Sequence, residues 1–445
     1  MALHLLKLIW NRKRANFLIV TEILLSFLVL AAVTTIALHY WRNYQSPLGF
    51  SYERIWDVIV RVPRGIDSTP AVDRERLARF ARLVDAVRQM PEVESVSHLG
   101  LPTFRNWEWN SDITLPDGRH VEFNGNRGGD GLAATLSMPL VDGRWFSRED
   151  AGQNWEAVVL NAAMARDVFG SEQAAGKPMP RENRPGRASD GPPPRPQRVV
   201  GVIQDFRQFG EYSTPVNYMF VRNDIVSASI APTSATAEPD AAAGAVAGGS
   251  ASRPDAAATA DRVNAQLPAA IVIRVRPGVT AEFEERLVRT LQAMAPDWSF
   301  GMKPTADVRG EYLRNNYLTP LAIMGMVAGF LLLMVTLGLS GVMWQNVTQR
   351  IRELGLRRAK GADRARIKRQ IFMEIALMTG IAMALGAVLL AQVPMLGWLG
   401  PVPPVVYAFS LALSAVLLFL LTSFCGWYPS LLATRIPPAE ALRYE

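Results

Sequence analysis

Four long apolar runs constrain the fold of this 445-residue chain more than any other feature. They occupy residues 17–38, 318–344, 371–390 and 405–424, and the first holds a single charged residue, Glu22. A helix needs about 20 apolar residues to cross the roughly 30 Å hydrocarbon core of a bilayer. The sequence therefore predicts a membrane protein with four transmembrane α-helices, one N-terminal and three C-terminal.

The first apolar run could be a cleaved signal peptide or a permanent transmembrane helix. A signal peptide has a shorter apolar region and ends in a small-residue cleavage site. This run ends instead in His39-Tyr40-Trp41-Arg42, which is typical of an aromatic belt at a membrane interface. We therefore favour an uncleaved helix over residues 17–41. The basic, leucine-rich residues 1–16 before it are expected to form an amphipathic helix on the membrane surface.

Residues 42–315 are water-soluble in character and are expected to form one large α+β domain. Alternating and helical periodicities predict two strand–helix–strand units, with the short strands of an antiparallel middle between them. The predicted segments are, in chain order, 55–62, 71–90, 93–99, 157–160, 198–203, 218–221, 270–275, 280–294 and 298–303. This order indicates an α+β domain with ferredoxin-like halves.

Two stretches of biased composition interrupt that domain. Residues 178–196 are rich in proline and arginine, and residues 228–260 consist largely of Ala, Pro, Ser, Gly and Thr. Neither stretch can bury enough apolar surface to offset the entropy of ordering it, so both are expected to be flexible insertions. For the second stretch, a solvated loop is favoured over a lipid-facing role.

The distribution of charge predicts the orientation. Residues 346–369, between the second and third runs, hold nine Lys or Arg against Glu353 and Asp363. Short basic loops stay in the cytoplasm, which places both termini inside and the large domain outside. The expected order is spans at 17–41, 316–345, 370–391 and 405–426, a cytoplasmic loop at 346–369, a periplasmic turn at 392–404 and a cytoplasmic tail at 427–445.

Several site classes are disfavoured by composition. The net charge of +7 comes mostly from the basic segments that are predicted to face the cytoplasm, so it does not indicate nucleic-acid binding. Aromatic residues also do not alternate with the basic ones, as a platform that stacks nucleic-acid bases requires. One cysteine, Cys425, excludes an intramolecular disulfide framework. The four histidines are scattered, so no metal site is expected. No catalytic pair appears, and the chain is expected to catalyse nothing alone.

The segment from Gly170 to Lys177 resembles a phosphate-binding loop only superficially. Five residues separate Gly170 from Gly176 where the phosphate loop has four, and Pro178 stands where a Ser or Thr must bind magnesium. We expect a loop that closes an α-helix.

Two charged features, one within the first predicted span and one between the second and third, are candidate functional sites. Glu22 is a candidate because intramembrane carboxylates often have a function, although it lies about two helical turns from Arg14, near the interface, where it can sit neutral or paired. The basic loop carries an apolar stripe that includes Ile351, Leu354 and Leu356. The composition of this loop is consistent with two functions: an anchor on anionic lipid or a helix docked in the groove of a cytosolic partner.

The amino-acid sequence of this loop favours docking to a cytosolic partner. Residues Gln349-Arg350-Ile351-Arg352-Glu353-Leu354-Gly355-Leu356-Arg357-Arg358-Ala359-Lys360-Gly361-Ala362, followed by Ile367, Gln370 and Glu374, resemble the loop of the MacB/FtsX-type ABC transporter permeases. The ending Pro438-Ala439-Glu440-Ala441-Leu442-Arg443 is similar to the close of that family. Segments 141–146, 158–161 and 199–206 resemble landmarks of its periplasmic core domain.

The resemblance implies a permease without a fused ATPase domain. Such permeases form dimers, either of one chain or with a sister permease, and bind two cytosolic ABC ATPases that hold the ATP and magnesium. The chain itself is then expected to hold no cofactor. The loop would be the coupling helix, and its candidate ATPase-coupling residues are Arg350, Arg352, Glu353, Leu354, Gly355, Leu356, Arg357, Arg358 and Gly361.

Three functions fit this resemblance. An efflux or export permease of the bacterial inner membrane, moving a drug-, peptide- or lipid-like substrate with a periplasmic adaptor and an outer-membrane channel, is favoured. The alternatives are a cell-division transducer that activates a cell-wall hydrolase and a lipoprotein-release permease. The external domain of the cell-division type is usually much smaller than residues 42–315.

Overall fold

The computed structural model describes residues 13–63, 69–180, 195–225, 267–279, 281–349, 364–398, 400 and 402–435. The chain divides into two compact units. Residues 1–42 and 315–445 form the first, called here the helical bundle, and Asn43–Arg314 form the second, called the mixed domain.

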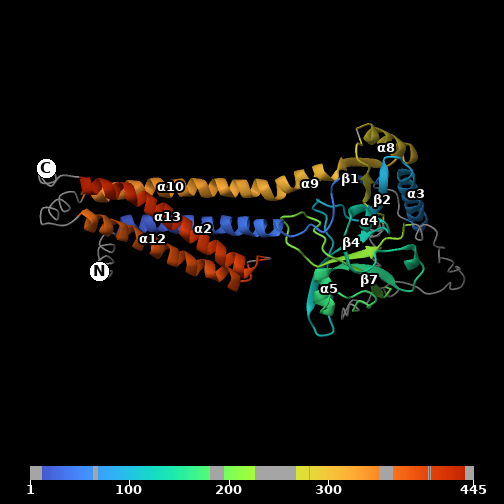
Figure 1. Cartoon of the computed structure of the whole chain (residues 1–445), viewed down its shortest axis with the longest axis horizontal. Helices are drawn as coiled ribbons and strands as arrows, with labels where there is room; N and C mark the ends of the chain where they lie inside the picture. Colours follow the sequence, from blue (N-terminus) through green and yellow to red (C-terminus); the bar gives the residue numbers. More distant parts are fainter. Residues whose placement is uncertain are drawn as a thin grey trace, which may run out of the picture. The chain divides into compact units, whose positions relative to one another are not determined.

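Among the described residues, the helical bundle contains four long helices, labelled in Figure 1. They are α2 (Lys13–Tyr44, which ends just inside the mixed domain), α10 (Thr319–Gln349), α12 (Arg364–Met395) and α13 (Pro404–Arg435). Each is long and apolar enough to cross a membrane. The four transmembrane helices predicted from the apolar runs are therefore confirmed in number and in chain order.

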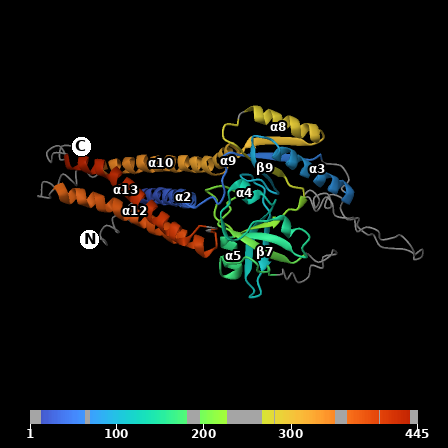
Figure 2. The same ribbon diagram turned by 45° about the vertical axis from the view of Figure 1, so that its right-hand side comes forward.

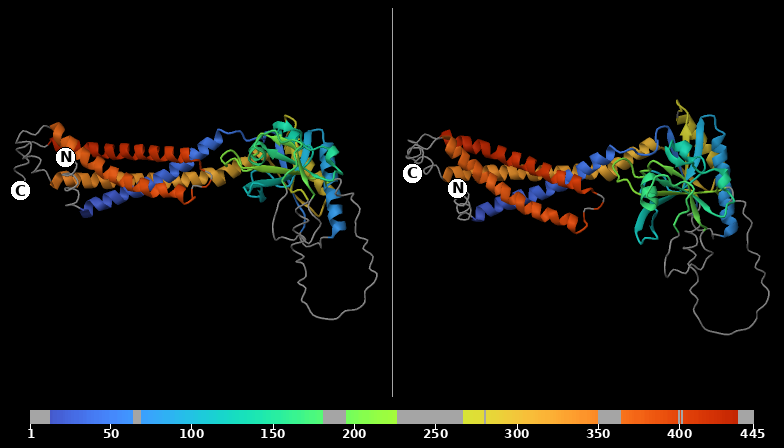
Figure 3. Two further views of the ribbon diagram at one scale, coloured as in Figure 1. Left: turned by 90° about the horizontal axis from the view of Figure 1, so that it is seen from below. Right: turned by 60° about the horizontal axis from the view of Figure 1, so that its bottom comes forward.

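One side of each bundle helix packs against the others. Phe27 of α2, Val335 of α10 and Leu418 of α13 are among the side chains buried in this contact. Figure 3 shows the helices running alongside one another. The outward sides keep large apolar side chains exposed, for example Met326 and Phe409. An apolar exterior of this kind suits a lipid environment.

The mixed domain holds ten strands and several helices within the described residues. In chain order they are β1 (Ile55–Arg61), α3 (Pro70–Arg88), β2 (Val93–Leu99), β3 (Asn110–Thr114), β4 (His120–Gly128), α4 (Leu132–Leu136), β5 (Leu140–Gly143), β6 (Glu156–Asn161), α5 (Ala162–Phe169), β7 (Gln197–Ile203), β8 (Tyr218–Arg222), β9 (Ala270–Val275), α8 (Ala281–Met294), β10 (Ser299–Pro304) and α9 (Thr305–Leu313). All nine segments predicted from periodicity are confirmed. The short elements β3, β4, β5, α4 and α9 were not predicted.

The expectation of ferredoxin-like halves is confirmed, because the two strand–helix–strand units interleave in one sheet as the halves of a ferredoxin-like fold do. The sheet order begins β10-β1-β9-β2, with β1 paired antiparallel to both strands of the other unit. Helices α3 and α8 cover this part of the sheet, and Figure 2 shows them close to β9. Interleaving lets both helices bury their apolar sides in one core, which includes Phe80 and Leu287.

The middle of the domain is mixed rather than antiparallel, which corrects the expectation for this part of the sheet. Strands β4 and β8 pair in parallel, and so do β6 and β7. A parallel pair needs a long crossover connection. Helix α5 and the residues that follow it supply one between β6 and β7.

The segment that superficially resembled a phosphate loop closes a helix, as predicted. Asn161 caps the start of α5 by accepting a hydrogen bond from the amide of Met164 at 3.0 Å. Gly170 follows the helix with φ of 71°, the left-handed conformation that favours glycine at a helix C-terminus. The Lys177 ammonium lies 5.3 Å from the ring centre of Phe169 rather than facing an anion site.

Some expectations fall on residues outside the described ranges. Of the predicted surface helix at 1–16, only residues 13–16 are described, and they belong to α2. Residues 181–194 of the first insertion and the whole of 228–260 lie outside as well.

Candidate functional site

The predicted coupling loop lies outside the described residues. Helix α10 ends at Gln349 and α12 begins at Arg364, so the loop joins these two helices. All nine of its candidate residues fall within 350–363 and have no described position. The role assigned to them stays a prediction.

Glu22 is described, and it lies where α2 crosses α10. Its side chain is half-buried and faces Gly338 of α10. A Cβ built on Gly338 would lie 2.7 Å from Oε2 of Glu22, so the carboxylate packs directly on this glycine and would have to shift if the glycine were replaced. This gives Glu22 a packing role. Whether it also has a functional charge stays a prediction, and unchanged transport in Glu22→Gln would contradict a functional charge.

Helix α2 also contacts the other two bundle helices through specific pairs. A Cβ built on Gly386 of α12 would lie 2.5 Å from the ring of Phe27. Thr35 Oγ1 and Ser410 Oγ of α13 lie 2.6 Å apart and share a hydrogen bond. Sequence reasoning missed both contacts. The spacing of two serines at 410 and 414 was the available signal, because residues four apart share a helix side.

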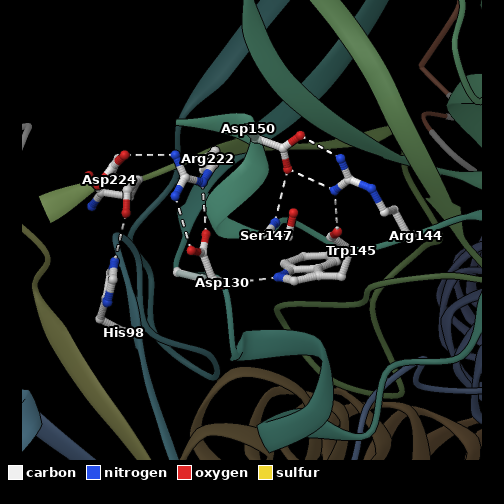
Figure 4. A network of polar contacts seen from close by, with 10 residues as sticks. His98, Asp130, Arg144, Trp145, Ser147, Asp150, Arg222 and Asp224 are labelled. Carbon is white, nitrogen blue, oxygen red and sulfur yellow. Dashed lines mark hydrogen bonds and ion pairs between the residues drawn. The ribbon is translucent and has the colours of Figure 1, made fainter. Parts of the chain in front are cut away.

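Segment 141–146, one of the landmarks of the resemblance, has a structural role in the mixed domain (Figure 4). The Arg144 guanidinium donates two hydrogen bonds to the Asp150 carboxylate, at 2.6 and 2.8 Å. Trp145 Nε1 donates to the carbonyl of Gly129 at 3.0 Å. The pKa of the Asp150 carboxyl is lowered: burial is the largest single effect and would raise it, but the hydrogen bonds from Arg144 and the Ser147 amide, together with the nearby positive charges, outweigh burial.

A second charged network ties the end of β8 to the loop after β4. Arg222 donates to Asp130 at 2.8 and 3.0 Å and to Asp224 at 2.7 Å (Figure 4). The nearby ring of His98 is buried, with Nε2 3.1 Å from the carbonyl of Asn223. Burial lowers the pKa of His98 to about 4, although the Asn223 carbonyl favours the charged form. His98 is therefore neutral at ordinary pH.

The other two landmark segments meet at Asn161. Asn161 Oδ1 accepts from the amide of Tyr218 at 2.9 Å, and Nδ2 donates to the carbonyl of Val216 at 2.8 Å. Asp205 caps the turn beside it by accepting from the amide of Phe206 at 2.8 Å. These contacts fix the start of β8 and the loop that follows β7.

Asp57, on β1, is the most perturbed carboxyl described. It is 2% exposed. Burial raises its pKa to about 7, against the opposing effects of the Thr305 hydroxyl and the Arg105 guanidinium. Thr305 is the first residue of α9, so Asp57 lies beside the start of that helix. Periodicity could not single it out, because the buried strand around it is otherwise apolar.

The described residues offer no metal site. Among them, no three His, Cys, Asp or Glu side chains are grouped closely enough to hold a metal ion. The polar networks of the mixed domain connect segments of its own chain.

Comparisons with known proteins place the chain in a family. The MacB-like periplasmic core domain family matches residues 17–291, and the FtsX-like permease C-terminal family matches residues 325–438. The chain belongs to the MacB/FtsX-like ABC transporter permeases. The resemblance found in the basic loop and the domain landmarks is thereby confirmed, and the chain is a multi-pass membrane protein.

Individual relatives are distant. The chain is 26% identical over 357 residues to a macrolide export ATP-binding/permease protein MacB of Bdellovibrio bacteriovorus. This alignment covers 79% of this chain and 46% of the relative. It is 24% identical over 324 residues to the uncharacterized ABC transporter permease YvrN of Bacillus subtilis, covering 69% of this chain and 66% of the relative. The chain thus spans about half to two thirds of the length of these relatives.

Among solved structures, the crystal structure of the periplasmic region of MacB from Actinobacillus actinomycetemcomitans aligns with a TM-score of 0.32 and 14% identity. The alignment covers 61% of this chain and 97% of that one.

Proposed function

We propose that this chain is the permease subunit of an ABC transporter in the bacterial inner membrane. A separate cytosolic ATPase hydrolyses ATP, and the permease passes the resulting motion to the mixed domain in the periplasm. Membership of the permease family supports this proposal, and so does the basic loop between α10 and α12, which predicts a cytoplasmic docking segment.

The observation that carries the proposal is that the chain is helical at both passages between the bundle and the mixed domain. The first passage lies within α2, which runs from Lys13 to Tyr44. The second lies in a π-helical segment, Arg314–Leu318, that joins α9 to α10. A hydrogen-bonded helix transmits displacement along its axis better than a flexible linker would. A π-helical turn often marks a functional position.

The proposed substrate is a drug-, peptide- or lipid-like molecule handled on the periplasmic side. Partners are a dimer mate, which is a second copy or a sister permease, membrane lipids and, for export, a periplasmic adaptor with an outer-membrane channel. ATP and magnesium belong to the ATPase. The size of the mixed domain, Asn43–Arg314, disfavours the cell-division transducer.

Purification of the full chain from its native membrane tests the proposal. We expect an ABC ATPase to co-purify and to hydrolyse ATP in the complex. A strain lacking the chain should become sensitive to drugs or peptides without retaining lipoproteins in its inner membrane. Lipoprotein retention would contradict the export function, and purification without any ATPase would contradict the permease role.

A further inference from the structure

The loop between β7 and β8 contains a buried arginine whose partners are main-chain carbonyls. Arg207 is 2% exposed. Its Nη1 donates to the carbonyls of Asn43 at 2.7 Å and Ser46 at 3.0 Å, and its Nη2 donates to the carbonyls of Glu211 and Ser213. The guanidinium therefore joins the chain at the end of α2 to the loop that holds Arg207 itself.

The position of these carbonyls explains why a cation is bound there. Asn43 belongs to the last turn of α2, at the negative end of the helix dipole, and its carbonyl also accepts from the amide of Ser46 at 3.0 Å. A guanidinium supplies several donors in a fixed geometry and stays charged when buried. Arg207 thus caps the C-terminus of the first transmembrane helix from within the mixed domain.

Two further contacts hold the same helix end to the same loop. Asn43 Nδ2 donates to the carbonyl of Tyr212 at 3.0 Å. The rings of Tyr44 and Tyr212 stack with their centres 5.6 Å apart. The end of α2 is therefore held by a cap, an amide hydrogen bond and a ring contact.

This loop also holds α9, the helix that leads into α10. Glu211 accepts hydrogen bonds from Arg309 of α9 at 2.6 and 2.7 Å, with both side chains largely buried. Gly210 has φ of +89°, and a Cβ there would lie 2.8 Å from Leu313 of α9. The loop approaches α9 so closely that only glycine fits at this position.

The loop is fixed to the sheet as well. The Tyr218 hydroxyl of β8 donates to Gln208 Oε1 at 2.5 Å, and Gln208 Nε2 donates to the carbonyl of Trp107 at 2.8 Å. A displacement of the loop must therefore carry β8 with it.

We propose that residues Arg207–Ser213, called here the anchor loop, are the element through which both helical connections move the mixed domain. In this assignment, which rests on the proposed permease function, Arg207 is the positioning residue for α2 and the Glu211–Arg309 pair is the latch for α9. The end of α2, the start of α9 and β8 then move as one body during the ATPase cycle.

The test uses the full-length chain in lipid nanodiscs with its co-purified ATPase. Cys425→Ser removes the only cysteine, so spin labels can be placed at Glu282→Cys on α8 and Met395→Cys on α12, both exposed. We expect ATP with vanadate to shift the distance between these labels in the otherwise unchanged protein. Arg207→Met should abolish this shift, while the rate of ATP hydrolysis falls less than twofold.

A matched control separates coupling from simple stability. Arg274 of β9 is also a buried arginine, which donates to the carbonyl of Thr135 and the hydroxyl of Ser137. Arg274→Met should keep the nucleotide-dependent shift. Equal loss in both variants, or a full shift in Arg207→Met, would overturn the role of Arg207.

Three further variants test the anchor loop at residues other than Arg207. Glu211→Arg should uncouple hydrolysis from the distance shift, and adding Arg309→Glu should restore it by reversing the ion pair. A short chemical crosslink between Tyr44→Cys and Tyr212→Cys should leave the shift intact, because these residues move together. A crosslink that blocks the shift would overturn the one-body assignment. Absence of both hydrolysis and shift in the unchanged protein would instead overturn the permease function itself, and this inference with it.

Discussion

The helical bundle and the mixed domain bury polar groups in different ways. In the bundle most buried polar side chains are hydroxyls, and Thr35 and Ser414 each donate to a carbonyl of their own helix. In the mixed domain the buried polar groups include ionisable side chains such as Arg207 and Asp57. A hydroxyl can be satisfied within one helical turn, whereas a guanidinium needs acceptors from several segments.

This difference separates local from long-range stabilisation. Each bundle helix forms its main-chain hydrogen bonds within itself, so packing between the helices depends on small residues and on the shape of their surfaces. The mixed domain depends on charged groups that join distant parts of the sequence, as Arg207 joins the loop after β7 to Asn43. Substitutions and pH should therefore affect the two regions unequally.

The largest effect is expected where the bundle binds its ATPase, and not in its packing. Glu353→Lys combined with Gly355→Pro should abolish co-purification of the ATPase, because it reverses a charge and breaks the predicted docking helix. Membrane insertion should be unchanged, since both residues lie between the spans. Quantitative pull-down from solubilised membranes measures the effect. A double variant that still retains its ATPase would show that the coupling site lies elsewhere.

Packing of the bundle should be sensitive at one glycine and tolerant at another on the same helix. Gly386→Leu should lower the free energy of unfolding by about 1–3 kcal/mol, because its side chain would overlap Phe27. Gly380→Leu is the matched control, since no atom lies within 4 Å of a Cβ built there. Denaturation of the purified protein in mixed micelles compares them. Equal losses in both variants would contradict the helix arrangement.

The pH dependence of stability should come from the mixed domain, through two groups with opposite signs. Buried Asp57, with its pKa raised to about 7, keeps a proton that the unfolded chain releases above its ordinary value of 3.8, so its contribution to stability falls as the pH rises through this window. Buried His98, with its pKa lowered to about 4, stays neutral where the unfolded chain binds a proton below 6.5, so its contribution falls as the pH drops.

Single variants should separate these opposing contributions between about pH 4 and 6.5. Each slope is roughly 1.4 kcal/mol per pH unit, and the two nearly cancel in the unchanged protein. His98→Gln should make the domain less stable as the pH rises, and Asp57→Asn should make it more stable as the pH rises. Hydrogen exchange of β9 amides in the full-length protein measures both slopes. Identical slopes in the two variants would contradict the assignments.

The smallest effect is expected for a hydroxyl in the bundle. Thr35→Val should cost about 0.6 kcal/mol, the typical value for a hydrogen bond between transmembrane helices, since it removes the bond to Ser410 and keeps the side-chain shape. The same micelle denaturation measures it. A loss as large as that of Gly386→Leu would mean that hydroxyl pairs, and not shape, hold the bundle together.

The parts of the fold that the sequence predicted are those that depend on local periodicity. The four apolar helices and the strands and helices around Phe80 and Leu287 follow from spacing along the chain. The interleaving of β1 between β9 and β10 pairs segments more than 200 residues apart, so local spacing does not predict it, and only the ferredoxin-like order of the elements indicated it. Strand β3 was missed because its residues, Asn-Ser-Asp-Ile-Thr, hold one apolar side chain.

The candidate site divides in the same way. The coupling loop is a prediction from the amino-acid sequence and lies outside the described residues, whereas Arg207 has no local signature among the many arginines of the chain. Its role became visible only when the structure placed it against carbonyls 164 residues away in sequence. Contacts that connect the two chain passages are long-range by nature, so a single sequence does not reveal them.

The central claim is that nucleotide turnover on the cytoplasmic side moves the mixed domain relative to the bundle. The most direct measurement is the distance between spin labels at Glu282→Cys and Met395→Cys, in the Cys425→Ser background, without nucleotide and with ATP and vanadate. The account predicts two distinct distance distributions that interconvert with nucleotide. A single distribution that stays unchanged while the bound ATPase hydrolyses ATP would contradict it.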